Sequence, residues 1–146
     1  MVWLETTKWE NQKYIDLRLN ASENEKIVLE FNPLKLSDAP DWNPMWEEWH
    51  CYAEPLRIYK SDYEMLVEYF NKVYPTKDAF DGTEETVFDI CSFNWIGKSD
   101  WQEIEEYIRC DIDSFPNDKK DFMSKFLDWL DEALNHTDII VVEGNL

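Results

Sequence analysis

Glycine is scarce in this sequence, and its scarcity excludes several classes of functional site. The chain of 146 residues has only 3 glycines, Gly82, Gly97 and Gly144, and they lie far apart. Phosphate-binding loops, dinucleotide-binding folds and nucleophile elbows need glycines where the backbone approaches a ligand. Three scattered glycines cannot build any of them, so the sequence does not indicate a nucleotide-dependent enzyme or a hydrolase with such an elbow.

Basic residues are the second shortage. The chain has 14 Lys and Arg against 32 Asp and Glu, which gives a net charge of -18. Proteins that bind DNA or RNA through phosphates present clustered Lys and Arg, so we expect no direct binding of nucleic acid. The same imbalance favours a cationic partner.

Cysteine and histidine are few and carry no recognisable motif. The cysteines, Cys51, Cys91 and Cys110, are odd in number and lack metal-ligand spacing, which predicts reduced thiols rather than a disulfide framework. His50 and Cys51 are adjacent, and neighbours in an extended strand point to opposite faces, so they cannot form a catalytic pair there. We therefore expect no catalytic residues, no metal site and no cofactor, and we predict that the protein is not an enzyme.

Long apolar runs are absent as well. No stretch approaches the roughly 20 apolar residues of a membrane span, and the first residues lack a cationic region followed by an apolar run. We therefore expect a cytoplasmic protein without membrane contact.

What the chain does have is aromatic residues in number. With 44% hydrophobic residues, including 8 Trp, 7 Tyr and 8 Phe, it is long enough for one sizeable core. No polar linker divides it, so we predict a single globular domain over residues 1–146.

Periodicity predicts an α+β domain with a mostly antiparallel sheet of about five to six strands, packed by three helices. The first third is expected to form an antiparallel meander, and the apolar run 87–96 a central strand. The other strands are expected at 2–9, 13–19, 26–31, 56–59 and 139–142, and residues 144–146 are expected to be a frayed tail. The helices are expected at 61–73, about 99–112 and 118–135. One core is expected to contain Phe88, Ile90, Trp101, Ile104, Phe126 and Leu130.

The second predicted helix divides into an apolar and an acidic face. Ser99 with Gln102 matches a capping box, which predicts the start of the helix. Trp101 and Ile104 recur at helical spacing and predict the core side. The other face carries acids at the same spacing, namely Asp100, Glu103 and Glu106.

These three acids belong to a longer acidic track over residues 78–113. The track has 11 acidic and 2 basic residues, and so a net charge of -9. Its acids also include Asp81, Glu84 and Glu85 in a polar link that is expected to be an exposed loop. Like charges at i and i+3 destabilise an exposed helix, which suggests that the charge is kept for binding, although a solubilising face is the simpler alternative.

The irregular segment 34–55 is a second acidic region. It combines three prolines with tryptophans and acids, and tryptophans are frequent anchors of protein interfaces. We therefore add Trp42, Trp46, Glu47 and Glu48 to the predicted partner-binding residues. The other members of that set are Asp100, Glu103, Glu106, Asp81, Glu84 and Glu85.

In overall character the chain resembles bacterial immunity proteins of contact-dependent inhibition and related polymorphic-toxin systems. The resemblance rests on two stretches, DWQEIEEYI at 100–108 and SDAPDWNPMWEEW at 37–49. It implies an acidic cytosolic α+β protein that neutralises a basic partner, a toxin nuclease domain, by occluding it. Two alternatives stay open: a nucleic-acid mimic that inhibits DNA- or RNA-binding proteins, and a small enzyme or ligand-binding domain.

Overall fold

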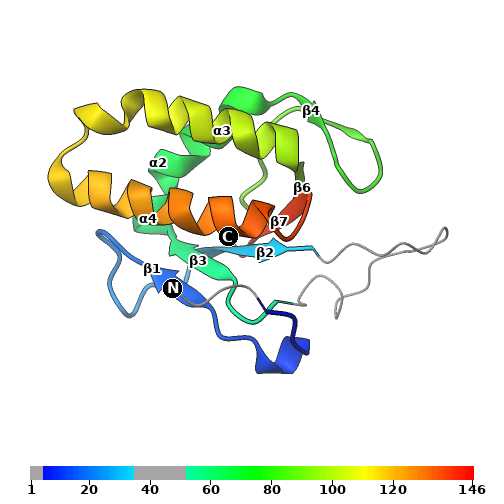
Figure 1. Ribbon diagram of the computed structural model, residues 1–146, viewed down its shortest axis with the longest axis horizontal. Helices are drawn as coiled ribbons and strands as arrows, with labels where there is room; N and C mark the ends of the chain where they lie inside the picture. Colours follow the sequence, from blue (N-terminus) through cyan, green and yellow to red (C-terminus); the bar gives the residue numbers. More distant parts are fainter. Residues whose placement is uncertain (1–4, 35–51) are drawn as a thin grey trace.

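A computed structural model describes residues 5–34 and 52–146 as an α+β domain. Its described helices lie together on one face of a five-stranded sheet (Figure 1). The strands, in their order across the sheet, are β1 (Ile15–Leu17), β3 (Leu56–Tyr59), β2 (Val28–Pro33), β7 (Ile139–Gly144) and β6 (Phe93–Gly97). The helices are α2 (Lys60–Phe70), α3 (Lys98–Asp111) and α4 (Asn117–Leu134).

Shorter elements connect these parts. The strands β4 (Thr76–Lys77) and β5 (Glu84–Glu85) pair as a separate antiparallel hairpin. Single 3-10 turns are η1 (Trp9–Asn11), η2 (Asn71–Val73) and η3 (Ile112–Ser114). The α+β class and the three predicted helices are confirmed in the described part of the chain.

The sheet is mixed, so the predicted antiparallel meander of the first third is wrong. β1 pairs in parallel with β3, which lies between β1 and β2, whereas the other neighbours in the sheet are antiparallel. The reason lies in the link after β1. Its backbone N–H groups at 19–21 donate to the buried carboxylate of Asp62 at the start of α2, at 2.7 to 3.2 Å. These hydrogen bonds hold the link at the start of α2, so β2 begins on the far side of β3 from β1.

The apolar run at 87–96 does not form the predicted central strand. Only its second half is a strand, β6, and that strand lies at the edge of the sheet. Asn94 accepts a hydrogen bond from the Asp89 N–H at 2.8 Å and donates to the Asp89 carbonyl at 2.7 Å, which holds residues 89–94 as a turn. β7 lies inside the sheet, between β2 and β6, which confirms the predicted pairing of the C-terminal β-branched run.

The predicted frayed tail is wrong at Asn145. Its side chain accepts a hydrogen bond from the Val28 N–H at 2.7 Å and donates to the Lys26 carbonyl at 2.9 Å. These two bonds fasten the end of the chain to the start of β2.

Helix α3 begins one residue before the predicted cap. Gly97 occupies the N-cap position without a side-chain hydrogen bond, so Ser99 and Gln102 form no capping box. The chain passes directly from β6 into the helix, and the Lys98 N–H bonds the Asp138 carbonyl at 2.8 Å, which leaves no extra turn for a cap. The predicted facing is nevertheless correct, because Trp101, Ile104 and Ile108 are fully buried.

The core between sheet and helices is built around aromatic rings. The ring of Phe31 on β2 lies 5.8 to 6.3 Å from four other rings, three of them at edge-to-face angles. These partners, contributed by all three helices, are Phe70, Trp101, Phe126 and Trp129. The predicted core set is confirmed, with Ile90 packing against the core while only partly buried.

Within the described ranges, none of the helices combines the length and apolar character that crossing a membrane requires.

Candidate partner-binding surface

The acids of α3 lie where the sequence places them, on the outside of the helix. Glu103 and Glu106 are exposed and form no ion pair with any residue that the structure describes. Asp100 is half-buried in the first turn, where its carboxylate accepts a hydrogen bond from the Thr76 hydroxyl at 2.7 Å. The predicted residues Trp42, Trp46, Glu47 and Glu48 lie outside the described residues.

Both basic residues of the acidic track turn toward α4 and away from these acids. The Arg109 guanidinium pairs with Asp131 on α4 at 2.9 Å and with Glu105 at 3.4 Å. The Lys98 ammonium donates to the Leu134 carbonyl at the end of α4, at 3.2 Å. The charge of Glu103 and Glu106 is therefore not compensated from within their own helix.

The acids of the polar link lie on the β4–β5 hairpin. Asp78 holds the hairpin turn, because its Oδ1 accepts the N–H of Phe80 at 2.7 Å and its carbonyl accepts the N–H of Gly82 at 2.9 Å. Gly82 has a φ of 74°, in the left-handed region that favours glycine. The exposure predicted for this link is confirmed, since Asp81, Glu84 and Glu85 are all exposed.

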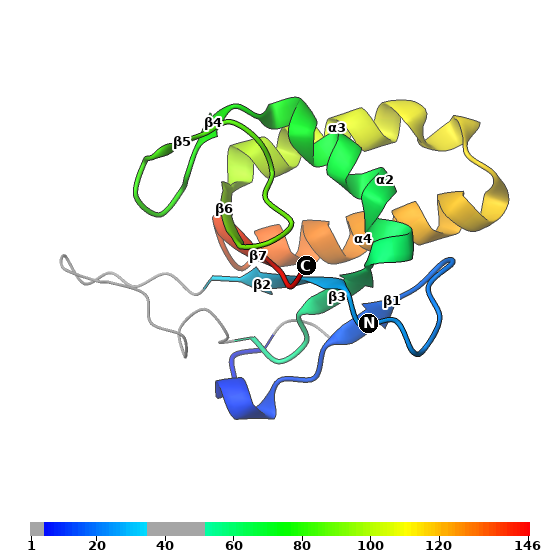
Figure 2. The same ribbon diagram turned by 180° about the vertical axis from the view of Figure 1, so that it is seen from behind.

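The fold brings this hairpin to the start of α3, as seen from both sides (Figures 1 and 2). The bond from Thr76 to Asp100 joins them, and the Ala79 N–H donates to the Trp95 carbonyl of β6 at 2.9 Å. From Asp100 the acidic face continues for six residues to Glu106, which at the rise of an α-helix is about 9 Å. We call the hairpin residues 76–85 together with Asp100, Glu103 and Glu106 the acidic end.

The phenol of Tyr74, at the base of the hairpin, is partly buried near several of these carboxylates. The pKa of its phenol is raised by burial and, to a lesser extent, by the charges of Asp100, Asp78 and Glu85. Carboxylates that disfavour a phenolate nearby favour a cation in the same place.

A cavity of about 120 Å³ opens between the hairpin and β6. Its acidic lining comes from Asp78, Glu85 and Asp89. The other lining residues are Tyr74, Thr76, Ser92, Phe93, Asn94 and Trp95. Burial raises the pKa of Asp78, although the backbone N–H groups that its carboxylate accepts act in the opposite direction.

Large apolar side chains stand exposed around the same end of the molecule. Phe80 and Phe93 are each 46% exposed and Val87 is 56% exposed. They are three of the six exposed large apolar residues in the described part, although they come from only 14 consecutive positions. The ring of Phe80 also stacks on Trp95, at 4.7 Å between centroids, and so joins the hairpin turn to the cavity wall.

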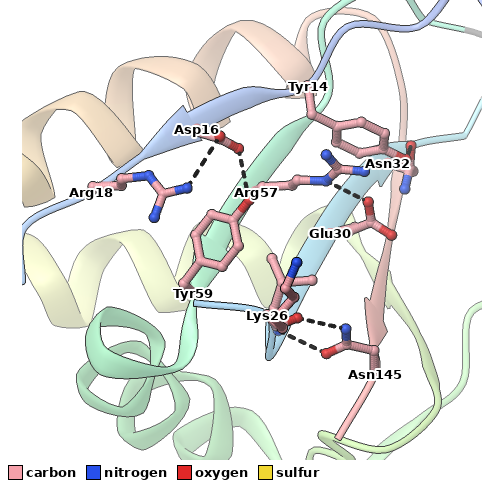
Figure 3. A network of polar contacts seen from close by, with 10 residues as sticks. Tyr14, Asp16, Arg18, Lys26, Glu30, Asn32, Arg57, Tyr59 and Asn145 are labelled. Carbon is pink, nitrogen blue, oxygen red and sulfur yellow. Dashed lines mark hydrogen bonds and ion pairs between the residues drawn. The ribbon is translucent and has the colours of Figure 1, made fainter. Parts of the chain in front are cut away.

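The sheet face turned away from the helices carries a polar network that the sequence analysis missed (Figure 3). The Arg57 guanidinium binds Glu30 at 2.7 Å, and the ring of Tyr14 lies 4.1 Å from the guanidinium carbon. Glu30 stands opposite Glu143 in the register of β2 and β7, so Arg57 offsets the repulsion between two neighbouring acids. The Tyr14 hydroxyl donates to the side chain of Asn32, which is fully buried.

A second cluster continues this network at the edge strand. Asp16 accepts hydrogen bonds from Arg18 at 3.4 Å and from the Tyr59 hydroxyl at 3.2 Å, and Arg18 also lies 4.1 Å from the centre of the Tyr59 ring (Figure 3). Arg18 and Arg57 are thus used within the protein. This face differs from the acidic end, whose exposed acids have no such partners among the described residues.

The arrangement does not form a metal centre in the described part of the chain, where no group of three or more His, Cys, Asp or Glu residues could hold a metal ion. Sequence reasoning missed the cavity. Asp78 and Asp89 were counted in the acidic track, but Phe93 and Trp95 were assigned to a central strand. The available signal was the polar stretch around Asp89 and Ser92, which interrupts the apolar run.

Comparison of the chain with protein-family models, with curated proteins and with solved structures gives no match.

Proposed function

We propose that this chain is an acidic binding protein that neutralises a basic protein partner, as an immunity protein that occludes a cognate toxin nuclease. The observation that carries the proposal is the composition of the acidic end and its surroundings. Exposed Phe80, Val87 and Phe93 stand there among exposed acids without ion-pair partners in the described residues. Interfaces combine apolar anchors, which supply binding energy when desolvated, with charges that supply specificity and steering.

The contrast with α4 supports the choice of surface. On α4, Asp121 pairs with Lys125 at 3.0 Å, and Lys120 reaches Asp113 at 3.1 Å. On α3, Glu103 and Glu106 follow each other at i and i+3 without an interleaved cation, an arrangement that weakens an isolated helix by a few tenths of a kcal/mol. Because Glu103 and Glu106 keep this repulsion, their surface is a candidate for contact with cations of another protein.

The mechanism needs no chemistry from this chain. The negative field of the acidic end steers a basic partner and speeds association at low ionic strength. The exposed apolar side chains then lose their contact with water, and the partner's active surface is covered. Occlusion of this kind blocks the partner's activity without altering it covalently.

The experiment uses the basic proteins encoded beside this chain in its source genome, and first measures which of them it inhibits. Calorimetric titration then compares the wild type with Glu103→Gln/Glu106→Gln. If partner cations lie against these acids, the loss is roughly 2–5 kcal/mol, or at least about thirtyfold in Kd. Thermal melts should show the variant to be as stable as the wild type or slightly more stable.

The matched control is Asp118→Asn/Asp128→Asn, which removes two exposed charges from α4 and leaves the net charge equal to that of the test variant. If both variants bind with the affinity of the wild type, the face of α3 only solubilises the protein. Inhibition of several unrelated nucleic-acid-binding proteins would replace the proposal by a nucleic-acid mimic. Turnover of a substrate without any partner would replace it by an enzyme.

A further inference from the structure

The geometry points to the cavity between the β4–β5 hairpin and β6 as the receptor for one lysine side chain of the partner. Its ammonium lies among Asp78, Glu85 and Asp89, and its methylene stem lies along the aromatic walls. This inference rests on the proposed function, since it names the chemical group that the acidic end takes from its partner.

The carboxylates retain free acceptor atoms within the described structure. One oxygen of Asp78 is used by the hairpin turn, and Oδ1 of Asp89 accepts the Cys91 N–H at 2.8 Å. The second oxygen of each has no hydrogen-bond partner among the described residues, and neither does the carboxylate of Glu85. Acceptor capacity therefore remains on all three acids that line the cavity.

The walls are held in place before any ligand arrives. Asp89 is bonded through its N–H and its carbonyl to the buried side chain of Asn94, which also donates to the Val142 carbonyl at 3.1 Å. On the opposite side, the Ala79 N–H ties the hairpin to β6. A preorganised site spends little binding energy on ordering its own groups.

The aromatic lining is an observation independent of the acids, and it also fits a lysine. Tyr74, Phe93 and Trp95 border the cavity, and Phe80 is stacked on Trp95. Ring faces attract cations, and the four methylene groups of a lysine pack against apolar surface while the ammonium stays with polar partners. A site for an anion or for a purely apolar group would not combine these linings.

The shape selects an ammonium over the other cations. No group of three or more His, Cys, Asp or Glu residues in the described part could hold a metal ion, so the cavity is not assigned to a metal. An ammonium has three donors that can reach acceptors in different directions, whereas a guanidinium is a planar fork that suits one carboxylate edge-on. Asp78 directly follows β4, Glu85 lies on β5 and Asp89 lies in the loop before β6, and a cavity of about 120 Å³ is narrow.

The test uses small probes and the intact chain. Butylammonium, which reproduces the lysine stem and head, is titrated while the backbone amide resonances of residues 92–95 are followed by NMR. Butylguanidinium and 1-butanol are the matched probes for an arginine head and for an uncharged one. We expect saturable shifts at these amides with butylammonium, and weaker binding of the other two.

Variants locate the binding to the cavity. Glu85→Gln removes a lining charge from a side chain that makes no hydrogen bond in the described structure, so the fold should persist. Asp128→Asn removes the same charge from the exposed side of α4, away from the cavity lining and from the acidic end. We expect Glu85→Gln to raise the Kd of butylammonium about fivefold, the equivalent of one unit-charge contact in solvent, and Asp128→Asn to leave it nearly unchanged.

Four results would overturn the inference: the absence of saturable shifts, equal weakening by both variants, tighter binding of butylguanidinium, or equal binding of 1-butanol. None of these bears on the partner experiment, because the exposed acids of α3 can bind a basic protein without the cavity. Conversely, if no basic protein proves to be a partner, saturable binding of butylammonium would still identify the cavity as an ammonium site.

Discussion

Replacing Glu105 with Gln should stabilise the protein at neutral and alkaline pH and leave it unchanged in acid. Glu105 lies on the inner side of α3 and is only 8% exposed. Its pKa is raised from 4.5 to about 7, mainly by burial. Asp131 raises this pKa further through a hydrogen bond and through its charge, and Arg109 lowers it. Among the described residues, no group donates a hydrogen bond to the buried Oε1 of its carboxylate.

The sign of the pH dependence follows from proton binding. Between about pH 4.5 and pH 7 the unfolded chain has lost this proton and the folded protein still holds it, so stability falls as the pH rises through this window. One pKa unit corresponds to about 1.4 kcal/mol, so the full shift would correspond to about 3 kcal/mol. Arg109 and Asp131 are about half exposed, so solvent screens their charge interactions with Glu105. We therefore expect Glu105→Gln to raise the free energy of unfolding by about 1–3 kcal/mol above pH 7.

Urea denaturation of the wild type and of Glu105→Gln at a series of pH values from 4.5 to 8 measures this difference. Glu103→Gln on the exposed face of the same helix is the control, because it removes one charge without removing a buried group. A Glu105→Gln variant that is destabilised equally at every pH would refute the reasoning. It would mean that the ionised pair with Arg109 contributes more than burial costs.

Three further substitutions test the packing and the connections of the fold by urea denaturation. Ile104→Ala, at a fully buried position, should cost about 2–5 kcal/mol, and a wild-type transition would contradict the facing of α3. Asp62→Asn should cost about 1–3 kcal/mol, because one amide oxygen cannot replace two carboxylate oxygens that accept the N–H groups at 19–21, and an unchanged midpoint would exclude this anchor. Gly144→Ala would place a Cβ 2.0 Å from the Ile90 carbonyl oxygen, so a cost of about 1–3 kcal/mol is expected, and an unchanged stability would contradict this close approach.

The sequence predicts helices and their faces well, because the information is local. The stripe of Trp101, Ile104 and Ile108 needs only the helical period, and the same holds for Phe126 and Leu130 on α4. The β-branched run of β7 is equally clear, since a strand buried on both faces needs an unbroken apolar sequence.

Strand order could not be predicted, because it depends on contacts between distant residues. The parallel pairing of β1 follows from the hydrogen bonds between Asp62 and the link after β1, which join residues more than 40 positions apart. The short length of β6 follows from Asn94, whose amide holds the residues from Asp89 onward in a turn. In the sequence alone, nothing distinguishes Asp62 or Asn94 from the other polar residues.

The candidate site likewise has a part that the sequence predicts and a part that it does not. The acids of α3 and of the hairpin could be found by counting charge, and their exposure agrees with that reading. Their proximity could not be found, since it depends on the bond between Thr76 and Asp100. The cavity was also out of reach, because its acids and rings meet only after the hairpin folds against β6.

The distribution of cations argues that the remaining charge of the acidic end is available to a partner. Arg57 and Arg18 neutralise acids on the face of the sheet, and Arg109 neutralises Asp131 beside the buried Glu105. The cost of a buried acid is reduced by backbone N–H groups at Asp62, and by a nearby guanidinium and a bound proton at Glu105. Among the described residues, no guanidinium pairs with the exposed acids of the hairpin and of α3, which repel one another. Lys77, opposite Glu84, is the one cation within the acidic end, so the remaining negative charge is left to be neutralised from outside.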